Sequence, residues 1–246
     1  MSQAYREAPR QHPAQQQGWI SRALGGLSSL IFWVFAAWMF SILAEWVGMW
    51  LWWPEEGVEH SRRMLEREIG YIDQDFRQSL LVQQPAAYVR LFAEVSYYYL
   101  FRVTGLEQVG LWLNQPPDPD GYRLQQSLRS LFAQIADHVI AAVNITQVFM
   151  MRLGVLTLAM PVFALFGLVA IVDGLVQRDL RRWGGGRESS FLYHHAKRLV
   201  WPSIVMAWVV YLAMPVSVHP NFVILPFAVL SAIAIAVTAS TFKKYL

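Results

Sequence analysis

The sequence predicts an all-α integral membrane protein with four transmembrane helices and a helical extracytoplasmic insertion between the first and second helices. Composition is the first observation behind this prediction. Hydrophobic residues make up 55% of the 246-residue chain and charged residues 15%, whereas soluble domains carry about 25% charged residues. The second observation is that four apolar runs are each long enough to cross a bilayer, which takes about 20 residues. The third is a polar region, residues 54–152, between the first two runs.

The chain starts with a polar segment, residues 1–26, which we interpret as a cytoplasmic tail. The first apolar run follows and covers residues 27–53. This run is longer than a signal-peptide core, which has roughly 7–15 residues, and no small-residue cleavage pattern follows it. We therefore predict an uncleaved signal anchor that forms the first transmembrane helix.

Tryptophans crowd the distal end of this run and predict an aromatic belt. Tryptophan prefers the headgroup level, where its ring is apolar and its N–H is hydrated. Glu45 lies just before these residues, so we expect it to be solvated near the interface. The alternative is a buried carboxylate, because an ionisable residue inside a membrane usually marks a functional site. The tryptophans are Trp46, Trp50, Trp52 and Trp53.

Residues 54–152 are predicted to form a helical region outside the spans. Apolar residues at three- and four-residue steps indicate a first amphipathic helix, which Pro85 ends. Residues 86–102 predict a second helix, whose aromatic stripe we expect in the core; contact with a membrane surface or a partner is the alternative. A short helix is predicted at residues 105–113, before a loop over residues 114–121. The apolar positions of the first helix are Val58, Leu65, Ile69, Ile72, Phe76 and Leu80.

A further helix is predicted from Tyr122 onward, and no Gly or Pro interrupts its pattern before Gly154. We therefore expect it to run unbroken into the second transmembrane span. Asp137 and His138 lie within it, but adjacent helical residues point in different directions. The pair is thus expected to be surface or core rather than a metal or catalytic site. The apolar face consists of Leu124, Leu128, Leu131, Ile135, Val139 and Ala142.

The second, third and fourth spans are predicted at residues 153–172, 200–218 and 222–240, before a short end at residues 241–246. Pro161 is expected to kink the second span. Small residues recur four apart in the fourth span, and such a stripe lets helices approach closely. We expect a helix–helix face there, within the protein or against another subunit, so a homo-oligomer is left open. The stripe consists of Ala228, Ala232, Ala236 and Ser240.

Lys and Arg concentrate in three segments, namely the tail, the connection 173–199 between the second and third spans, and the C-terminal end. With four spans, all three segments lie on one side, which the positive-inside rule assigns to the cytoplasm. Both termini are then cytoplasmic, and residues 54–152 are extracytoplasmic, which in a bacterium means periplasmic. Acidic residues outnumber basic ones in that region, so no direct contact with nucleic acid is expected.

The cytoplasmic basic loop, residues 173–199, is dense enough in polar groups to suggest a contact site. Glycines adopt positive φ, a serine caps the helix predicted at residues 191–198, and arginines beside a helix N-terminus hold a phosphate, an anionic lipid headgroup or a protein partner. The stretch lacks the Gly-Lys-Ser/Thr ending of a P-loop. The alternative is a hairpin turn whose arginines only set the orientation. The candidate contact residues are Arg178, Arg181, Arg182, Gly184, Gly185, Gly186, Arg187, Glu188, Ser189, Ser190, His194 and Lys197.

The sequence offers no clear set of catalytic or metal-binding residues. The chain has no cysteine, and His194 and His195 have only the poorly placed Glu188 as a third ligand near zinc spacing. The predicted spans contain Ser and Thr but no His or Asp at depth to act as a base, and few polar residues to line a pore. We therefore predict no catalytic residue, metal or cofactor.

The run from Asp173 to Lys197, DGLVQRDLRRWGGGRESSFLYHHAK, closely resembles the signature of a family of integrating conjugative element membrane proteins, a domain of unknown function. The resemblance extends over most of the chain and leaves out the tail before Trp19. It implies a protein of the bacterial inner membrane, encoded with the type IV secretion-like DNA-transfer system of an integrative element. The family carries no catalytic or cofactor residues that could be transferred to this chain.

Taken together, these features predict a non-enzymatic structural or assembly component of a conjugative apparatus. Its expected partners are the lipid bilayer and other membrane components of the transfer system. The working surfaces would be the loop 178–197 and the aromatic helix 86–102. A small transporter or channel subunit is the alternative, and it would gain support if Glu45 were buried at a midplane cavity with a cationic partner. A membrane enzyme would require a pocket around His194, His195 and Glu188.

Overall fold

The structure is a computed structural model, and it describes residues 19–75, 83–115, 123–184 and 190–242. All regular elements within these ranges are helices, which confirms the predicted all-α class. Four of the helices are long and apolar enough to cross a membrane. The chain divides into two compact units, Met1–Ala36 and Ala37–Leu246.

Helix α1 (Trp19–Leu51) begins in the first unit and ends in the second. In the first unit it exposes large apolar side chains, among them Phe32 and Trp33, whose rings meet edge to face at 5.8 Å. The helix differs at both ends from the predicted span 27–53. It starts earlier because the residues after Trp19 are compatible with a helix. It stops at Leu51 because a residue before a proline, here Pro54, is disfavoured in the helical region.

Four helical segments precede α5 in the described part of the polar region. They are α2 (Val58–Asp75), α3 (Pro85–Tyr97), the π-helical turn η1 (Tyr98–Arg102) and α4 (Leu106–Leu113). Gly105 joins η1 to α4 with a φ of 76°, a left-handed conformation that favours glycine. Most of the predicted loop 114–121 lies outside the described residues.

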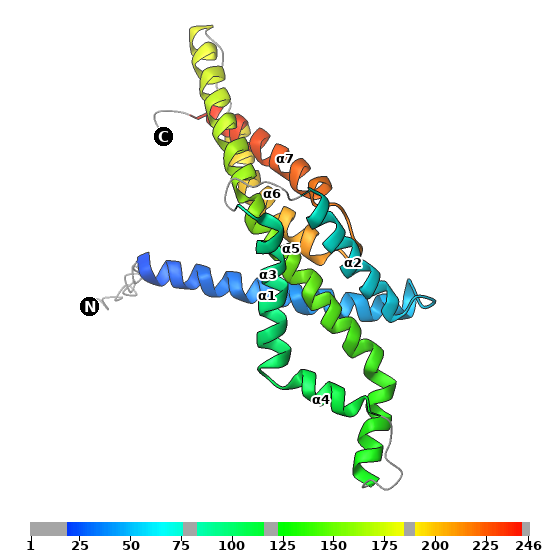
Figure 1. Ribbon diagram of the computed structural model, residues 1–246. Coiled ribbons are helices and arrows are strands. Elements are labelled where there is room, and N and C mark those ends of the chain that lie inside the picture. Colours follow the sequence, from blue (N-terminus) through cyan, green and yellow to red (C-terminus); the bar gives the residue numbers. More distant parts are fainter. Residues whose placement is uncertain (1–18, 76–82, 116–122, 185–189, 243–246) are drawn as a thin grey trace, which may run out of the picture. The chain divides into compact units, whose positions relative to one another are not determined.

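Helix α5 (Arg123–Trp183) has 61 residues and continues through Pro161. At 1.5 Å per residue it is about 90 Å long. Its first part belongs to the polar region and its later part is apolar, so the prediction of a helix that runs unbroken into the second span is confirmed. Figure 1 shows this helix as the element against which the others in the second unit are arranged.

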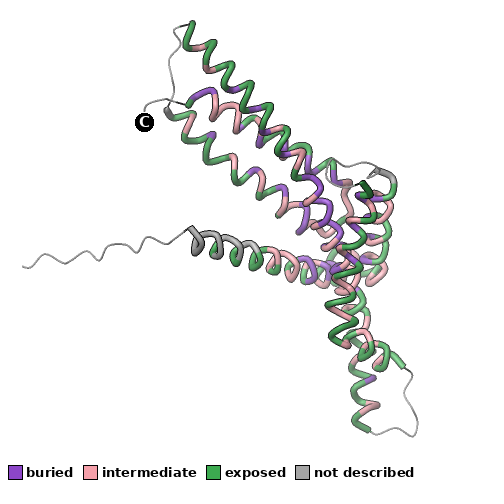
Figure 2. Tube along the Cα trace, turned by 60° about the vertical axis from the view of Figure 1, so that its left-hand side comes forward, coloured by how far each residue is buried: buried purple, intermediate pink, exposed green. Residues whose placement is uncertain are grey.

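Helices α6 (Ser190–Ala213) and α7 (Pro220–Ser240) complete a three-helix bundle with the later part of α5. Helix α7 packs against both α5 and α6, while α2 and α3 pack against the middle of α5. Buried residues gather where these helices meet, and the outer faces of the bundle are exposed (Figure 2). Exposed apolar faces of this kind fit helices whose solvent is lipid.

Two predicted boundaries in the bundle are wrong. Residues 173–199 do not form a loop, because α5 continues to Trp183 and α6 begins at Ser190. Charged residues alone do not end a helix, and the first glycine after Gly174 is Gly184. The third span was predicted at 200–218, but α6 ends at Ala213, since Pro215 disfavours the helical conformation just before it.

The buried faces of the insertion helices also differ from the prediction. On α2, the residues that face the core are Ser61, Met64, Glu68 and Ile72 rather than the whole apolar series, and Leu65 and Ile69 are only half-buried. The series ends at Phe76 and Leu80, which lie outside the described residues.

On α3, the buried residues are Pro85, Val89 and Ala93, while Tyr98 and Tyr99 of η1 are exposed. The expected aromatic core is therefore only partly formed, because Tyr88, Phe92, Tyr97 and Phe101 are half-buried. Small side chains face α5 because the helices approach closely there. A Cβ added at Gly154 would lie 3.3 Å from the Val89 Cα.

Candidate functional site

The structure distributes the predicted contact residues over two helix ends instead of one loop. Arg178, Arg181 and Arg182 lie in the last turns of α5, and His194 and Lys197 in the first turns of α6. Gly184 follows α5 directly. The residues Gly185, Gly186, Arg187, Glu188 and Ser189 lie outside the described residues, and of Ser190 only the backbone is described.

Some of these basic side chains are held by the chain itself. The Arg178 guanidinium pairs with the neighbouring Asp179 at 3.3 Å. Arg181 Nη1 donates to the Ser240 carbonyl at 3.4 Å, which places positive charge at the C-terminus of α7, where the helix dipole favours it. Lys197 Nζ lies 5.7 Å from the centre of the Tyr193 ring. Within the described ranges, no group of three His, Asp or Glu residues could hold a metal ion.

The small residues of α7 lie against neighbouring helices of the same chain. A Cβ at Gly174 of α5 would lie 2.5 Å from the Ala236 carbonyl oxygen. Ala228 and Ser240 are buried, whereas Ala232 is half-buried. The Ser231 and Ser203 hydroxyls bond across α7 and α6 at 2.9 Å. The structure therefore accounts for much of the stripe by packing inside the bundle.

A buried arginine that the sequence analysis did not single out connects the polar region to the bundle. Arg152 lies on α5 and is only 1% exposed. Its Nη1 donates to the Tyr211 carbonyl at 3.1 Å and to the Met214 carbonyl at 2.6 Å. Its Nη2 donates to the Val216 carbonyl at 2.8 Å. Arg152 thus caps the C-terminal end of α6 and orders the connection between α6 and α7.

The remaining donors of Arg152 bind a carboxylate from α2. Arg152 Nε and Nη2 donate to Glu68 Oε1 at 3.0 and 2.7 Å. Burial raises the pKa of Glu68, and the Arg152 guanidinium opposes that rise. The Tyr211 ring lies 5.3 Å from the Arg152 Cζ, and its buried hydroxyl lies beside Glu68 without a hydrogen bond of ordinary length. We refer to Arg152, Glu68 and Tyr211 as the Arg152 cluster.

Two further contacts join α2 to the connection between α6 and α7. The Ser217 hydroxyl donates to the Met64 carbonyl at 3.1 Å. The rings of Tyr71 and His219 meet edge to face at 5.2 Å. The polar region and this connection therefore lie next to each other. Such contacts are compatible with a four-span arrangement, which places both on the same side of the membrane.

A buried hydrogen bond corrects the expectation that Glu45 is solvated. Glu45 is 1% exposed, and its two carboxylate oxygens lie 3.0 and 3.1 Å from His60 Nδ1. Trp53 stacks on the His60 ring at 3.9 Å. The reason for the burial is that the chain turns after Pro54 and brings the first turn of α2 back over Glu45.

The Asp137-His138 pair behaves as expected for surface and core residues. Asp137 is exposed, and His138 is half-buried beside Trp46, with ring centres 6.0 Å apart. Trp46 Nε1 donates to the His138 carbonyl at 2.9 Å. The His138 Nδ1 atom is buried without a hydrogen-bond partner among the described residues.

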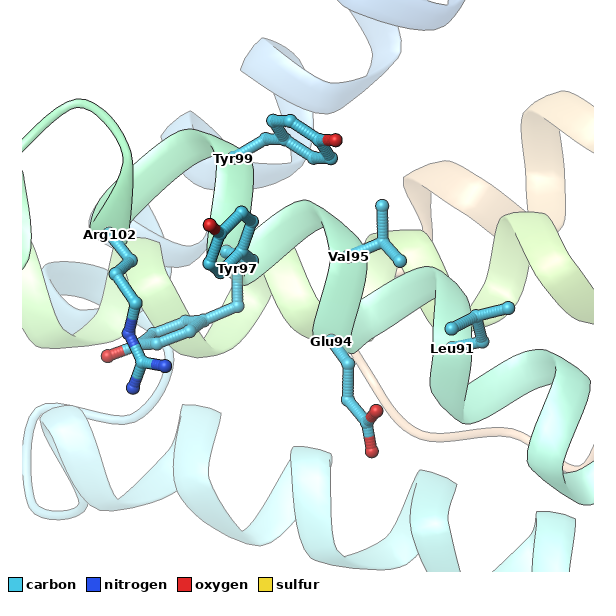
Figure 3. A pocket seen from close by; sticks show the side chains of 7 residues that line it. Leu91, Glu94, Val95, Tyr97, Tyr99 and Arg102 are labelled. Carbon is cyan, nitrogen blue, oxygen red and sulfur yellow. The ribbon is translucent and has the colours of Figure 1, made fainter.

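An open pocket of about 530 Å³ lies along α3 and η1. Figure 3 shows Tyr97, Tyr99, Glu94 and Arg102 around it. Arg102 is engaged with Glu107 at 3.2 Å. Burial and the Glu107 carboxylate raise the pKa of Tyr97. The pocket is thus the concave side of the predicted aromatic helix, and its charged groups are partly paired within the chain.

The sequence pattern indicates the Arg152 cluster only weakly. Arg152 stands between Met151 and Leu153 at the start of a long apolar run, where an unpaired charge would be costly. Glu68 sits between the predicted apolar positions of its helix. Each residue alone is ambiguous, because the partners are 84 residues apart along the chain.

The fold and these contacts define an all-helical protein with four helices long and apolar enough to cross a membrane, and with a polar helical region anchored to the α5–α7 bundle by a buried arginine. The sequence also matches the family described as IncC plasmid conjugative DNA transfer protein DtrJ-like, over residues 52–243. This chain belongs to that family, which confirms the resemblance to conjugative-transfer proteins. No curated protein and no solved structure matches the chain. The match begins at Trp52, after the end of α1.

Proposed function

We propose that the protein is a non-enzymatic structural or assembly component of a conjugative DNA-transfer apparatus in the bacterial inner membrane. The observation that carries this proposal is membership of a conjugative DNA-transfer family over residues 52–243. The architecture supports it. Four candidate spans would anchor the chain.

A mating experiment tests this role. The gene is deleted in frame from the element, and donor cells are complemented with the full chain or with an empty vector. Transfer of the element to recipients should fall by orders of magnitude without the protein and recover with it. Excision of the element in the donor should stay unchanged, because a membrane component acts after DNA processing. Normal transfer from the deletion strain would reject the proposal.

The basic ends of α5 and α6 are the proposed surface for cytoplasmic partners of the apparatus. Replacing Arg181, Arg182 and Arg187 with Ala should lower transfer while protein levels stay normal. A matched control removes three arginines from α2, namely Arg62, Arg63 and Arg67, which are exposed. Equal effects of the two triple variants would show that total charge matters, and the proposed surface would then be wrong. Crosslinking followed by affinity purification from donor cells would identify the partner.

A small transporter or channel subunit is a second candidate, favoured by one observation. The carboxylate of Glu45, near the end of the first apolar helix, is buried and lies within hydrogen-bond distance of His60. A Glu45→Gln variant should then abolish ion flux in proteoliposomes. Absence of any protein-dependent flux with the unmodified chain would remove this candidate.

A further inference from the structure

Arg152 holds two different parts of the fold through separate donor atoms. Both hydrogens of Nη1, and one of Nη2, bind the carbonyls of Tyr211, Met214 and Val216. Nε and the other Nη2 hydrogen bind Glu68 of α2. Departure of Glu68 therefore removes none of the bonds by which Arg152 orders the connection between α6 and α7.

Helix α2 turns a partly polar side toward the core. Ser61 and Glu68 are both buried there, next to the apolar Met64 and Ile72. Asn144 of α5 donates to the Ser61 hydroxyl at 3.1 Å, and His60 pairs with Glu45. A buried ion pair adds little net attraction, because desolvation of the charges offsets most of it. The docked position of α2 is therefore held partly by polar bonds that water can replace and partly by Met64, which packs with Ile145 and Val148 of α5.

The opposite side of α2 is already suited to water. Its exposed residues include Arg62, Arg63, Glu66 and Arg67. Release of α2 would expose the apolar Met64 and Ile72, which is its main cost, and would return the charge of Glu68 to solvent. Release of this helix is thus a local event, which differs from unfolding of the bundle.

We propose that the Glu68–Arg152 pair is a latch that lets α2 alternate between a docked and a released state while the bundle stays folded. In the docked state Glu68 accepts hydrogen bonds from the two Arg152 donors that do not bind carbonyls. In the released state Arg152 keeps its carbonyl bonds and the α6–α7 connection keeps its shape.

Single cysteines test this latch, because the chain has none of its own. Ser61→Cys reports the docking of α2, and Ser203→Cys, at a residue also buried, reports the contact between α6 and α7. The rate of reaction with a water-soluble maleimide is measured on the purified full chain in detergent micelles. Adding Glu68→Gln should speed the reaction at position 61 by on the order of a hundredfold, since one partner of a buried pair is lost. The reaction at position 203 should not change.

The control is Asp73→Asn, which removes a carboxylate from the same helix. Asp73 pairs with Arg90, and both side chains are about half exposed, so its loss should change the rate at position 61 by less than about threefold. Arg152→Gln should speed the reaction at both reporter positions, because the α6–α7 connection then loses its cap. If Ser61→Cys does not fold, Ile72→Cys on the same buried side replaces it.

Two results would overturn the latch. An unchanged maleimide reaction rate at position 61 when Glu68→Gln is added would show that the pair does not hold α2. Equal acceleration at positions 61 and 203 in that variant would show that α2 and the bundle open as one unit. These measurements do not involve DNA transfer, so they are independent of the proposed function.

Discussion

Burying the charge of Arg152 is costly, and the cost is offset because every N–H donor of its side chain has an acceptor. A guanidinium has five N–H donors, and each finds an acceptor in Glu68, in the Tyr211 carbonyl of α6 or in a carbonyl of the α6–α7 connection. A lysine offers three donors in a different geometry and could not satisfy the same set. The identity of this residue therefore matters as much as its charge.

Replacing Arg152 with Met should lower the free energy of unfolding by about 3–5 kcal/mol, because Glu68 is left as an unpaired buried charge. Arg152→Lys should give an intermediate loss. The measurement is thermal or denaturant unfolding in detergent. The matched control is Arg90→Met, which breaks an exposed ion pair worth about 1 kcal/mol or less. Similar losses for Arg152→Met and Arg90→Met would contradict the importance of burial.

The raised pKa of Tyr97 predicts that the stability of the protein depends on pH in the alkaline range. Burial and the Glu107 carboxylate raise its pKa above the ordinary value of 10.0. The folded protein therefore holds the phenol proton more tightly than the unfolded chain does. This contribution to stability is present below pH 10.0 and is lost as the pH rises through the raised pKa.

Glu107→Gln should lower the pKa of Tyr97 toward its ordinary value. The phenolate absorbance of each protein is titrated against its Tyr97→Phe version, which isolates this residue from the other tyrosines. Glu94→Gln is the control, because Glu94 lines the same pocket without perturbing Tyr97. An unchanged titration in the Glu107→Gln variant would contradict the assigned cause.

At the scale of elements, the contact between α5 and α7 depends on a missing side chain. A Cβ at Gly174 would lie 2.5 Å from the Ala236 carbonyl oxygen and 2.7 Å from the Ala239 Cβ. Gly174→Ala should therefore destabilise the protein by about 1–3 kcal/mol. Gly70 is the matched control, since it is helical and has open space around it. Gly70→Ala should stabilise the protein by up to about 1 kcal/mol. Stabilisation by both substitutions would show that the helices do not touch there.

The sequence predicts which segments are helical more reliably than it predicts the residues at which the helices end. Continuity of α5 was predictable because no breaker precedes Gly154. The end of α6 was misjudged because hydropathy continues past Ala213 while Pro215 changes the backbone. The predicted loop 173–199 is too long, because the charged residues after Asp173 continue α5 to Trp183.

The buried polar pairs could not be predicted from local patterns. Arg152 is 84 residues from Glu68 and 59 residues from Tyr211 along the chain. A pattern of apolar residues at helical spacing predicts which side of α2 is buried, but it assigns Glu68 to solvent. Only the three-dimensional arrangement shows that the carboxylate has a partner, and the same holds for Glu45 and His60.

For the whole molecule, membership of a conjugative DNA-transfer family and four candidate spans agree with one membrane architecture. The contacts of Met64 with Ser217 and of Tyr71 with His219 support placing α2 and the α6–α7 connection on the same side. The positive-inside rule predicts that this side is extracytoplasmic, with the basic ends of α5 and α6 in the cytoplasm.

Reporter fusions test this architecture most directly. Alkaline phosphatase, which is active outside the cytoplasm, and green fluorescent protein, which fluoresces inside it, are each fused after Pro117 and after Gly185. We expect phosphatase activity only for the fusion after Pro117 and fluorescence only for the fusion after Gly185. The same compartment for both positions would contradict the four-span topology and, with it, the proposed cytoplasmic contact surface.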